Sequence, residues 1–428
     1  MKYLIIGNGV ASLGAIEGIR VTDQEGAITV VSDEPVPTYG RPLISYLLAG
    51  RIGKERLALR DDAFYAANKV TLKLDTTVAT IDTKAKSVTT KAGETIPYDK
   101  LLIATGGVPF RPPMAGLEGE GVYSFTTFAH AEALAEAAGR VKRAVVIGGG
   151  LIGLKAAESL FDRGVAVSIV ELAPRVLSMA FDDKAGRIVS ERLNKIGLKV
   201  FCNVSAKEIR RENGKIKGVA LSDGTFLDAD IVVVAIGVIP ASGLAKDAGV
   251  KVDRGILVDD HLAASVDGVY AAGDVAQAPD MLVEGKRVVP IWPNAFNQGY
   301  YAGKNMAGDA VSYLGGLAMN AISFYGLATT SVGLVNPPAD DAGFEVHDVL
   351  NPEAGSYRKL VFKDGRLVGC VLVGDIDSAG LYTGFIRFKF PLDADARQKL
   401  IDGAPSILMW PEGFFDENWN PVGAKETV

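Results

Sequence analysis

One pattern of apolar and polar positions occurs twice in the chain. In each copy a short apolar strand leads through a glycine-rich turn into an amphipathic helix, and a second apolar strand ends in acidic residues. The copies read KYLIIGNGVASLGAIEGI followed by AITVVSDE, and RAVVIGGGLIGLKAAESL followed by AVSIVELAPR. Each is typical of a βαβ unit, so two nucleotide-binding units are expected.

An antiparallel region is expected after each copy. Residues 70–90 and 207–237 alternate between apolar and polar positions, and the first runs into the buried strand YDKLLIATGG while the second ends in DADIVVVAIG. Residues 256–277 then read as a strand pair that returns to the first unit. The second domain is therefore predicted to be inserted into the first, with crossings near residues 112 and 240.

A third region begins near Tyr313. Residues 356–375 alternate around Lys-Asp-Gly-Arg, which indicates a hairpin, and residues 376–390 are helix-like. The tail from residue 404 contains four aromatic residues, Trp410, Phe414, Phe415 and Trp419. They are expected either to pack on their own domain or to form a docking surface for a partner.

The predicted fold class is α/β, with two nested Rossmann-like domains and a C-terminal α+β domain. The first domain is assigned residues 1–112 and 240–312, the second residues 113–239, and the third, with the aromatic tail, residues 313–428.

Charge and cysteine content exclude several functions. The net charge is −6 and no basic run is present, so nucleic-acid binding is not expected. No apolar run reaches the roughly 18–20 residues of a membrane span, so a cytoplasmic protein without a membrane association is expected. Cys202 and Cys370 cannot hold an iron–sulfur cluster or zinc. His130, His261 and His347 are scattered, and no metal site is predicted.

The first glycine-rich turn has the spacing of a dinucleotide fingerprint. Its first glycine permits the turn, its second lets the backbone approach a pyrophosphate, and the third position, here Ser12, must be small. The residues predicted to bind here are Gly7, Gly9, Val10, Ala11 and Ser12. After the next strand, either Asp33 or Glu34 can accept hydrogen bonds from a ribose.

The second turn is a complete GxGxxG. Its predicted binding residues are Gly148, Gly150, Leu151, Ile152 and Gly153. Glu171 ends the following strand and is expected to bind the ribose 2′-hydroxyl, which favours NAD(H) over NADP(H). Arg175 lies close enough in sequence to weaken that preference.

Residues 268–275 form a strand that ends in small residues and one carboxylate. Gly273 admits a bulky ligand, and Asp274 can accept a hydrogen bond from a polyol hydroxyl. With these elements the chain resembles the pyridine nucleotide-disulfide reductase superfamily over residues 1–312. The resemblance implies a glutathione-reductase-type fold, FAD at the first fingerprint with Asp274 on the ribityl chain, and NAD(H) at the second.

The same resemblance implies further cofactor-binding positions. They are Arg41, Pro42, Val78, Ala104, Thr105, Gly106, Pro293, Asn294, Ala295 and Gly237. The helix that starts near Pro293 would direct its positive end at the flavin pyrimidine edge.

A narrower likeness lies in residues 39–50, YGRPLISYLLAG. This run and the hairpin of residues 363–375 resemble nitrite-reductase-type and rubredoxin-reductase-like flavoproteins, which pass electrons from NAD(P)H to iron–sulfur or rubredoxin centres. Similar flavoproteins accompany carbon monoxide dehydrogenase, so membership of such a complex is one expectation. A homodimer or a hetero-complex is left open.

The chain departs from these families at the redox centre. No Cys-x4-Cys is present, and Pro42 stands about where peroxide-reducing relatives carry a single cysteine. Many relatives place a Lys–Glu pair beside the flavin N5; here those positions are Tyr46 and Lys155. Lys155 is predicted to supply positive charge near N5 and the nicotinamide. The alternative is that Lys155 lies on the helix surface.

The expected function is that of an FAD-dependent NAD(P)H oxidoreductase that exchanges electrons between NAD(H) and an iron–sulfur electron carrier. One alternative is a hydrogen-peroxide-forming NADH oxidase or small-molecule reductase. Another is a non-catalytic flavin-binding subunit.

Overall fold

The computed structural model describes residues 1–338, 341–411 and 414. Two compact units make up the chain. The nucleotide unit contains Met1–Met179 and Ser190–Leu317, and the C-terminal unit contains Ala180–Val189 and the chain from Ala318 onward. The positions predicted for the domain boundaries stay a prediction.

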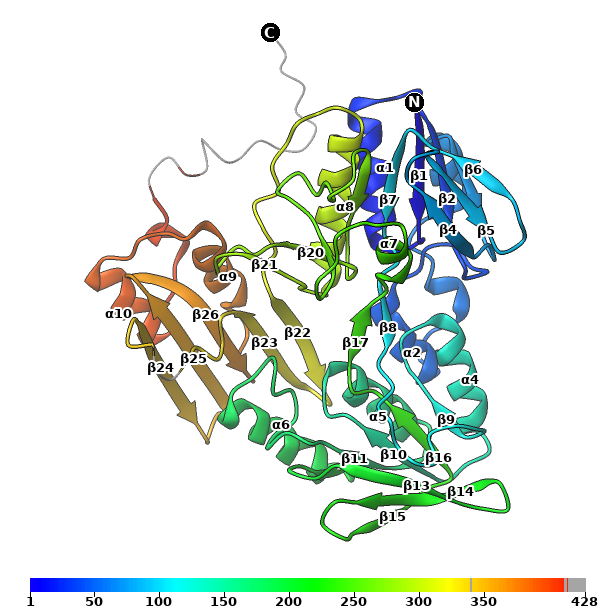
Figure 1. Ribbon diagram of the computed structural model, residues 1–428. Coiled ribbons are helices and arrows are strands. Elements are labelled where there is room, and N and C mark those ends of the chain that lie inside the picture. The colour runs from blue at the N-terminus through cyan, green and yellow to red at the C-terminus, as the bar shows by residue number, and fades with distance from the viewer. Residues whose placement is uncertain (339–340, 412–413, 415–428) are drawn as a thin grey trace. The chain divides into compact units, whose positions relative to one another are not determined.

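The first sheet of the nucleotide unit is parallel and has the order β19-β7-β1-β2-β3 (Figure 1). Its strands are β1 (Lys2–Ile6), β2 (Ala27–Val31), β3 (Val70–Lys73), β7 (Lys100–Ile103) and β19 (Val269–Ala271). Helix α1 (Val10–Thr22) connects β1 to β2. Most side chains of β1, β2 and β7 are buried, as expected for a parallel sheet.

The second sheet repeats this arrangement with the order β9-β16-β10-β11-β12. Its strands are β9 (Val122–Tyr123), β10 (Arg143–Ile147), β11 (Ala166–Val170), β12 (Lys199–Phe201) and β16 (Ile231–Val234). Helix α5 (Leu151–Asp162) connects β10 to β11. The predicted duplication of the βαβ unit is therefore present in the structure.

Each parallel sheet is followed by a three-stranded antiparallel sheet. The first contains β4 (Val78–Asp82), β5 (Ser87–Thr90) and β6 (Thr95–Pro97), and the second β13 (Ala206–Glu212), β14 (Lys215–Leu221) and β15 (Phe226–Asp228). Within residues 256–277, β18 (Ile256–Leu257) pairs with Ala276 and Gln277 at the start of β20 (Ala276–Pro279), so the predicted strand pair is present. Strand β19 lies between them in sequence and joins β7, which returns the chain to the first sheet as predicted. An isolated bridge between Ala263 and Tyr270 adds a further contact within this run.

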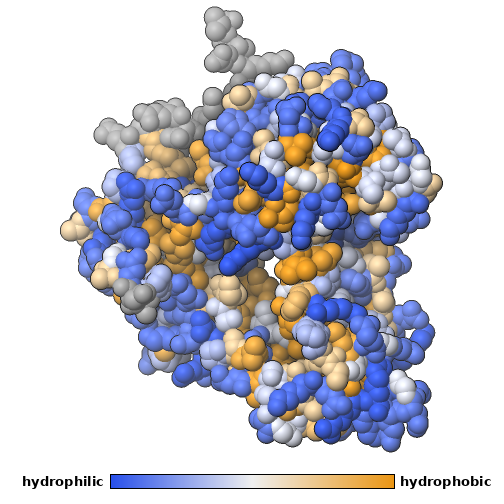
Figure 2. All heavy atoms as spheres, viewed as in Figure 1, coloured by the Kyte–Doolittle hydropathy of each residue, from blue (hydrophilic) through white to orange (hydrophobic). Residues whose placement is uncertain are grey.

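Two short strands carry the chain between the halves of the nucleotide unit. They are β8 (Gly107–Pro109) and β17 (Val238–Pro240), which pair antiparallel with Val108 opposite Ile239. Apolar atoms reach the surface around this ribbon (Figure 2), and both side chains are about half exposed.

Helices α1 and α8 (Trp292–Met306) touch through glycines on both helices. A Cβ on Gly14 would lie 2.2 Å from the Phe296 carbonyl oxygen, and one on Gly299 would lie 1.9 Å from the Ala11 carbonyl oxygen. Both positions therefore require glycine for the backbones to come this close.

Shorter elements complete the nucleotide unit. They are η1 (Arg41–Leu43), α2 (Ile44–Leu48), η2 (Lys54–Arg56), α3 (Asp62–Ala67), α4 (Phe128–Ala138), α7 (Gly243–Asp247) and β21 (Lys286–Arg287). Helix α6 (Asp183–Lys195) begins in the C-terminal unit, and its residues from Ser190 onward belong to the nucleotide unit. Among the described residues, none of the helices combines the length and apolar character required to cross a membrane.

The C-terminal unit contains a five-stranded antiparallel sheet in the order β22-β23-β26-β25-β24. Its strands are β22 (Met319–Phe324), β23 (Leu327–Gly333), β24 (Phe344–Asn351), β25 (Ser356–Lys363) and β26 (Arg366–Val373). Helices α9 (Ala379–Phe388) and α10 (Ala394–Asp402) and the 3-10 turn η3 (Ile407–Met409) follow. The predicted hairpin and helix are confirmed, and Asp364 and Gly365 turn the hairpin with positive φ values of 50° and 69°.

The segment Ala180–Val189 is held in the C-terminal unit by Asp182. The Tyr357 hydroxyl donates to its carboxylate at 2.5 Å, and Lys359 Nζ lies 3.3 Å from the same oxygen. Burial, and then the bond to Asp182, raises the pKa of Tyr357 above its usual range. This segment falls within residues 113–239, so part of the sequence predicted for the second domain packs with the C-terminal sheet.

Two of the tail aromatics pack within the C-terminal unit. The rings of Trp410 and Phe414 lie 5.0 Å apart and edge to face, and both contact Phe388 and Phe390. Gly384 makes room on α9 for the indole. Own-domain packing thus accounts for these two residues, whereas Phe415 and Trp419 lie outside the described residues.

Candidate functional site

The carboxyl ends of β1, β2, β7 and β19 lie at one edge of the first sheet, because these strands are parallel neighbours. The residues predicted for FAD therefore gather at that edge, where ligands of open parallel sheets bind. They follow the strand ends as Gly7, Gly9, Val10, Ala11 and Ser12; Asp33 and Glu34; Ala104, Thr105 and Gly106; and Gly273 and Asp274.

The turn between β1 and α1 explains why serine replaces the usual third glycine. Gly7 has a φ of 104°, and a Cβ there would meet the Ala104 carbonyl oxygen at 2.2 Å. The Ser12 hydroxyl donates to the Gly7 carbonyl oxygen at 2.6 Å. In the second turn a Cβ on Gly153 would lie only 1.9 Å from the equivalent oxygen, that of Gly148. The first turn thus accommodates a small side chain by hydrogen bonding to it.

The middle glycines of the two turns have no reason within the protein to be glycine. Gly9 and Gly150 have ordinary negative φ values of −92° and −78°. A Cβ on either would have nothing within 4 Å among the described residues. The space beside each therefore fits an external group that approaches the backbone closely, as a pyrophosphate does.

Both turns open directly into helix N-termini. Neither α1 nor α5 has a side-chain cap or an acidic residue in its first turn. Their first backbone N–H groups, which no side chain caps, and the positive end of each helix dipole suit phosphate oxygens. Together with the middle glycines, these ends show that the residues present fit two dinucleotides.

Asp274 lies at the end of β19, in the same part of the first site. In the described portions of the chain its carboxylate has no hydrogen bond or ion pair. Burial raises the pKa of Asp274, and the positive charge of Arg41 acts in the opposite direction. A half-buried carboxylate of this kind is stabilised by a hydroxyl donor, so the polyol role predicted for Asp274 fits.

Glu34 is tied to neighbouring side chains. The Tyr39 hydroxyl donates to one of its oxygens at 2.7 Å, and Arg41 forms an ion pair with the other. Arg41 also donates to the Thr126 carbonyl oxygen at 2.9 Å. Burial lowers the pKa of nearby His130 and raises that of Tyr39 above its usual range. Asp33, by contrast, is exposed.

Other predicted FAD residues have structural contacts. Thr105 donates to the Ala241 carbonyl oxygen at 2.9 Å, which ties the two crossings together beside Gly106. Val78 is buried in the hydrophobic core of the first half. Asn294 exchanges two hydrogen bonds of 3.3 Å with Leu317.

The remaining FAD residues lie at helix starts. Pro42 is in the first turn of η1, and Pro293 and Ala295 are in that of α8, which has no acidic residue or side-chain cap. The side chain of Ala295 is 3.7 Å from where a Cβ on Gly273 would stand, so α8 begins beside the end of β19.

The second site is built on Glu171, the first residue after β11. Its two carboxylate oxygens accept hydrogen bonds from the Gly149 and Ala173 amides, at 2.6 and 2.7 Å. The carboxylate is therefore fixed beside the turn that also contains Gly148, Leu151 and Ile152. Gly237, with a φ of 117°, follows β16 at the same edge of the sheet.

Helix α5 contacts α2 through a polar row that includes both predicted catalytic residues. Tyr46 and Lys155 line one small cavity together with Ser45 and Glu158. Lys155 forms a 2.6 Å ion pair with Glu158, whose side chain is only 8% exposed. The partner carboxylate thus lies one turn along α5 from the position where many relatives carry it.

The thiols form no redox pair. Cys202 belongs to the nucleotide unit and Cys370 to the C-terminal unit, and both are free. Burial raises the pKa of Cys370 to about 12 and also raises that of Cys202, where the charge of Glu171 adds to the effect. Neither is a reactive thiolate at neutral pH.

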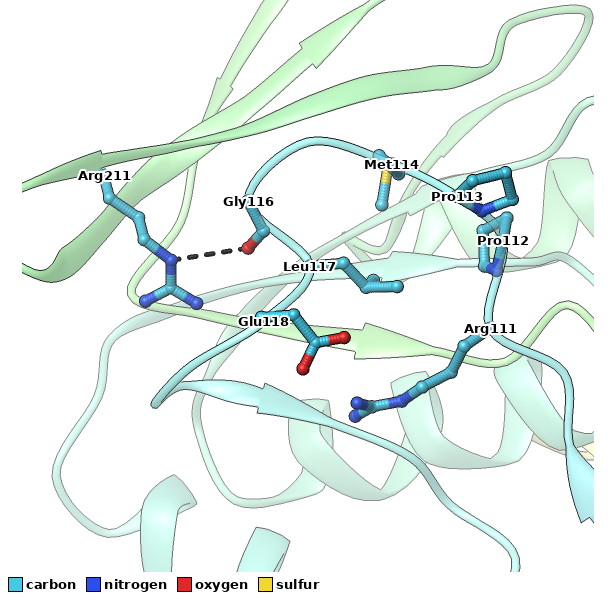
Figure 3. A pocket seen from close by; sticks show the side chains of 8 residues that line it. All are labelled: Arg111, Pro112, Pro113, Met114, Gly116, Leu117, Glu118 and Arg211. Atoms are coloured by element: carbon cyan, nitrogen blue, oxygen red, sulfur yellow. Dashed lines mark hydrogen bonds between the residues drawn. The ribbon is translucent and has the colours of Figure 1, made fainter.

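A cavity of about 470 Å³ lies at the crossing rather than at either fingerprint (Figure 3). Arg111 and Glu118 point toward each other across it. Arg211 reaches in from β13 and donates from Nε to the Gly116 carbonyl oxygen at 3.3 Å. None of the predicted site residues lines this cavity.

Several polar residues of the site carry no signal in the sequence. Asn8 occupies an unspecified position of the GxGxxG pattern, and Thr38 lies outside that pattern, so the hydrogen bond between them becomes evident only in the structure. Glu158, three residues after Lys155, is the exception, because spacing on a helix predicts such a pair.

The model of the pyridine nucleotide-disulphide oxidoreductase family matches residues 1–299, and that of the rubredoxin NAD+ reductase C-terminal domain matches residues 319–389. The chain therefore belongs to this family of FAD-dependent NAD(P)H oxidoreductases.

Individual relatives differ in length and activity. The chain is 33% identical to nitrite reductase [NAD(P)H] of Bacillus subtilis over 87% of its own length and 46% of that protein, so it spans about half of this relative. It is 34% identical to the NADH-dependent phenylglyoxylate dehydrogenase subunit epsilon of Aromatoleum evansii, over 90% and 91% of the two chains. The crystal structure of a ferredoxin reductase for the CYP199A2 system of Rhodopseudomonas palustris has a TM-score of 0.85 at 27% identity, covering 96% and 98%.

The middle glycines give a matched pair of substitutions. Gly9→Ala is expected to weaken FAD binding by about tenfold or more, and Gly150→Ala to weaken NADH binding similarly while FAD is retained. The added methyl group has no atom of the described residues within 4 Å but occupies space at the backbone of each turn. Flavin fluorescence titration of the apoprotein and NADH titration of the holoprotein measure the two effects. FAD binding by Gly9→Ala at wild-type affinity would contradict the assignment.

Asp274→Asn is expected to stabilise the apoprotein at neutral pH and to weaken FAD binding several-fold. Because the pKa is raised from 3.8, the folded apoprotein binds a proton more tightly than the unfolded chain, so this contribution to stability falls as pH rises through the raised value. Urea unfolding of the wild-type and Asp274→Asn apoproteins between about pH 4 and pH 8 measures the difference in their free energies of unfolding. The stability difference should grow with pH, and a difference independent of pH would count against an unpaired carboxylate.

Proposed function

We propose that this protein transfers electrons between NAD(H) and an iron–sulfur electron carrier protein, with FAD bound at the first fingerprint. The observation that carries the proposal is that one compact unit contains two glycine-rich turns, each opening into a helix without a side-chain cap, and only one of the two free cysteines. Electrons then leave by a route other than a dithiol. Similarity to a ferredoxin reductase, and a rubredoxin-reductase-type C-terminal domain, support an iron–sulfur protein as the partner.

The two cofactors supply hydride transfer and the conversion to single electrons, and the chain supplies binding and orientation. Gly9 and the N-terminus of α1 hold a pyrophosphate, and Asp274 accepts a hydrogen bond from the ribityl chain. The N-terminus of α8 places positive potential at the flavin pyrimidine edge. Glu171 orients the ribose of the nicotinamide nucleotide.

NAD(H) is the proposed coenzyme rather than NADP(H). The Glu171 carboxylate is held by two backbone amides and cannot turn away from a ligand easily. Its charge would repel a 2′-phosphate. Arg175 is the residue that could instead favour a 2′-phosphate. Its guanidinium donates to the Ser178 carbonyl oxygen at 3.5 Å, which is a contact within its own loop.

Membership of a larger complex is supported by similarity to a subunit epsilon of an NADH-dependent dehydrogenase. The association with carbon monoxide dehydrogenase, the choice between homodimer and hetero-complex, and the cytoplasmic location stay predictions.

Anaerobic titration of the FAD-loaded protein with NADH tests the function. The flavin absorbance near about 450 nm should bleach, and a ferredoxin or rubredoxin should restore it much faster than oxygen does. Fast reoxidation by oxygen alone would replace the proposal with an NADH oxidase. No bleaching by NADH or NADPH would leave a flavin-binding subunit.

Lys155→Met tests the charge on the α2–α5 contact. We expect flavin reduction by NADH in a single turnover to slow by about tenfold, because the cation beside Tyr46 is lost while FAD remains bound. Lys54→Met is the matched control, since Lys54 forms an exposed ion pair with Glu132. An unchanged rate in Lys155→Met would mean that Lys155 has only a structural role on the helix.

A further inference from the structure

The two halves of the nucleotide unit differ at the first residue after the second strand. Gly7 and Gly148 each donate to the last residue of that strand at 2.8 Å, to the carbonyls of Val31 and Val170. The following residues, Ser32 and Glu171, each donate to the last residue of the third strand. Ser32 therefore occupies the position of Glu171, and Asp33 and Glu34 lie one and two residues beyond it.

The residue inside the turn differs in a complementary way. In the second half Gly149 stands after the first glycine, and a Cβ there would lie 3.0 Å from Glu171 Oε2. A side chain at this position and an acid at the strand end thus compete for one space. The first half has Asn8 in the turn and the short Ser32 at the strand end.

A chain of hydrogen bonds orients the Asn8 carboxamide. The Tyr65 hydroxyl donates to Thr38 Oγ1 at 2.9 Å, and Thr38 donates to Asn8 Oδ1 at 2.6 Å. The amide oxygen is therefore engaged, and the nitrogen is left as the group for another partner. Asn8 Nδ2 is buried and has no hydrogen-bond partner among the described residues. A buried donor without an acceptor costs free energy, which a ligand acceptor would recover.

We propose that the Asn8 carboxamide, rather than a carboxylate after β2, binds the adenosine ribose of FAD, with Nδ2 donating to a ribose hydroxyl oxygen. Glu34 already holds Tyr39 and Arg41. The inference rests on the FAD site of the proposed function, not on the identity of the electron acceptor. The ribose of FAD carries no competing 2′-phosphorylated form that the site must reject, so a neutral amide suffices there. The nicotinamide coenzyme has such a form, NADP(H), and the charge of Glu171 repels its 2′-phosphate.

The test measures how strongly ADP, 2′-deoxy-ADP and 3′-deoxy-ADP compete with FAD for binding to the apoprotein. The wild type should bind ADP about tenfold more tightly than at least one deoxy analogue, and Asn8→Ala should bind all three with equal, weakened affinity. Thr38→Val keeps Asn8 but removes its orienting donor, so it should lose part of the discrimination. FMN, which has no adenosine, should bind wild type and Asn8→Ala equally.

Three results would overturn the inference. They are wild-type discrimination retained in Asn8→Ala, no discrimination in the wild type, and discrimination lost in Asp33→Asn or Glu34→Gln but kept in Asn8→Ala. Thermal unfolding of each apoprotein shows whether the variant is folded, and Thr38→Val gives the answer should Asn8→Ala fail to fold. Absence of FAD binding by the wild type would overturn the FAD assignment as well.

Discussion

The contact between helices α1 and α8 is the constraint on which the first site depends. At Gly14, Gly18, Gly299 and Gly303 an added Cβ would lie between 1.9 and 2.3 Å from a backbone oxygen of the other helix. Four glycines with two four-residue spacings therefore let the two backbones meet. Larger side chains would separate the helices and move the start of α8 away from the fingerprint.

This contact unites parts of the chain that are distant in sequence. The start of α1, the end of β19 and the start of α8 converge where a Cβ on Gly273 would lie 3.2 Å from that of Ala11. Asp274 is thereby brought to the fingerprint, although its carboxylate makes no hydrogen bond to the residues that the structure describes. The glycines serve the fold and the site together, because the same close packing that excludes side chains leaves the helix ends open.

The sequence predicts those parts of the structure that depend on local pattern. Strand polarity, glycine spacing and the position of Glu171 follow from the βαβ pattern, since parallel strands bring their carboxyl ends together. The attachment of residues 180–189 does not, because it depends on an ion pair between Asp182 and Lys359, far apart in sequence. The strand pair expected over residues 256–277 is present, since β18 pairs with the start of β20, whereas β19 takes its partner from β7, which is far away in sequence. The proposed role of Asn8 could not be predicted from the sequence either, because it depends on the short Ser32 after β2 leaving space for the Asn8 side chain.

The duplication also separates what the fold requires from what each nucleotide requires. Gly7 and Gly148 face the same backbone obstruction in both halves, so they belong to the fold. Ser12 and Gly153, or Ser32 and Glu171, differ between halves that share one topology, so their identity reflects the ligand or the local packing. The pair Lys155 and Glu158 belongs to a third class, because it lies on α5 of the second half and contacts α2 of the first. Because the pair lies where helices of the two halves meet, it is the place where one charge could act on two nucleotides, and its effect on hydride transfer stays a prediction.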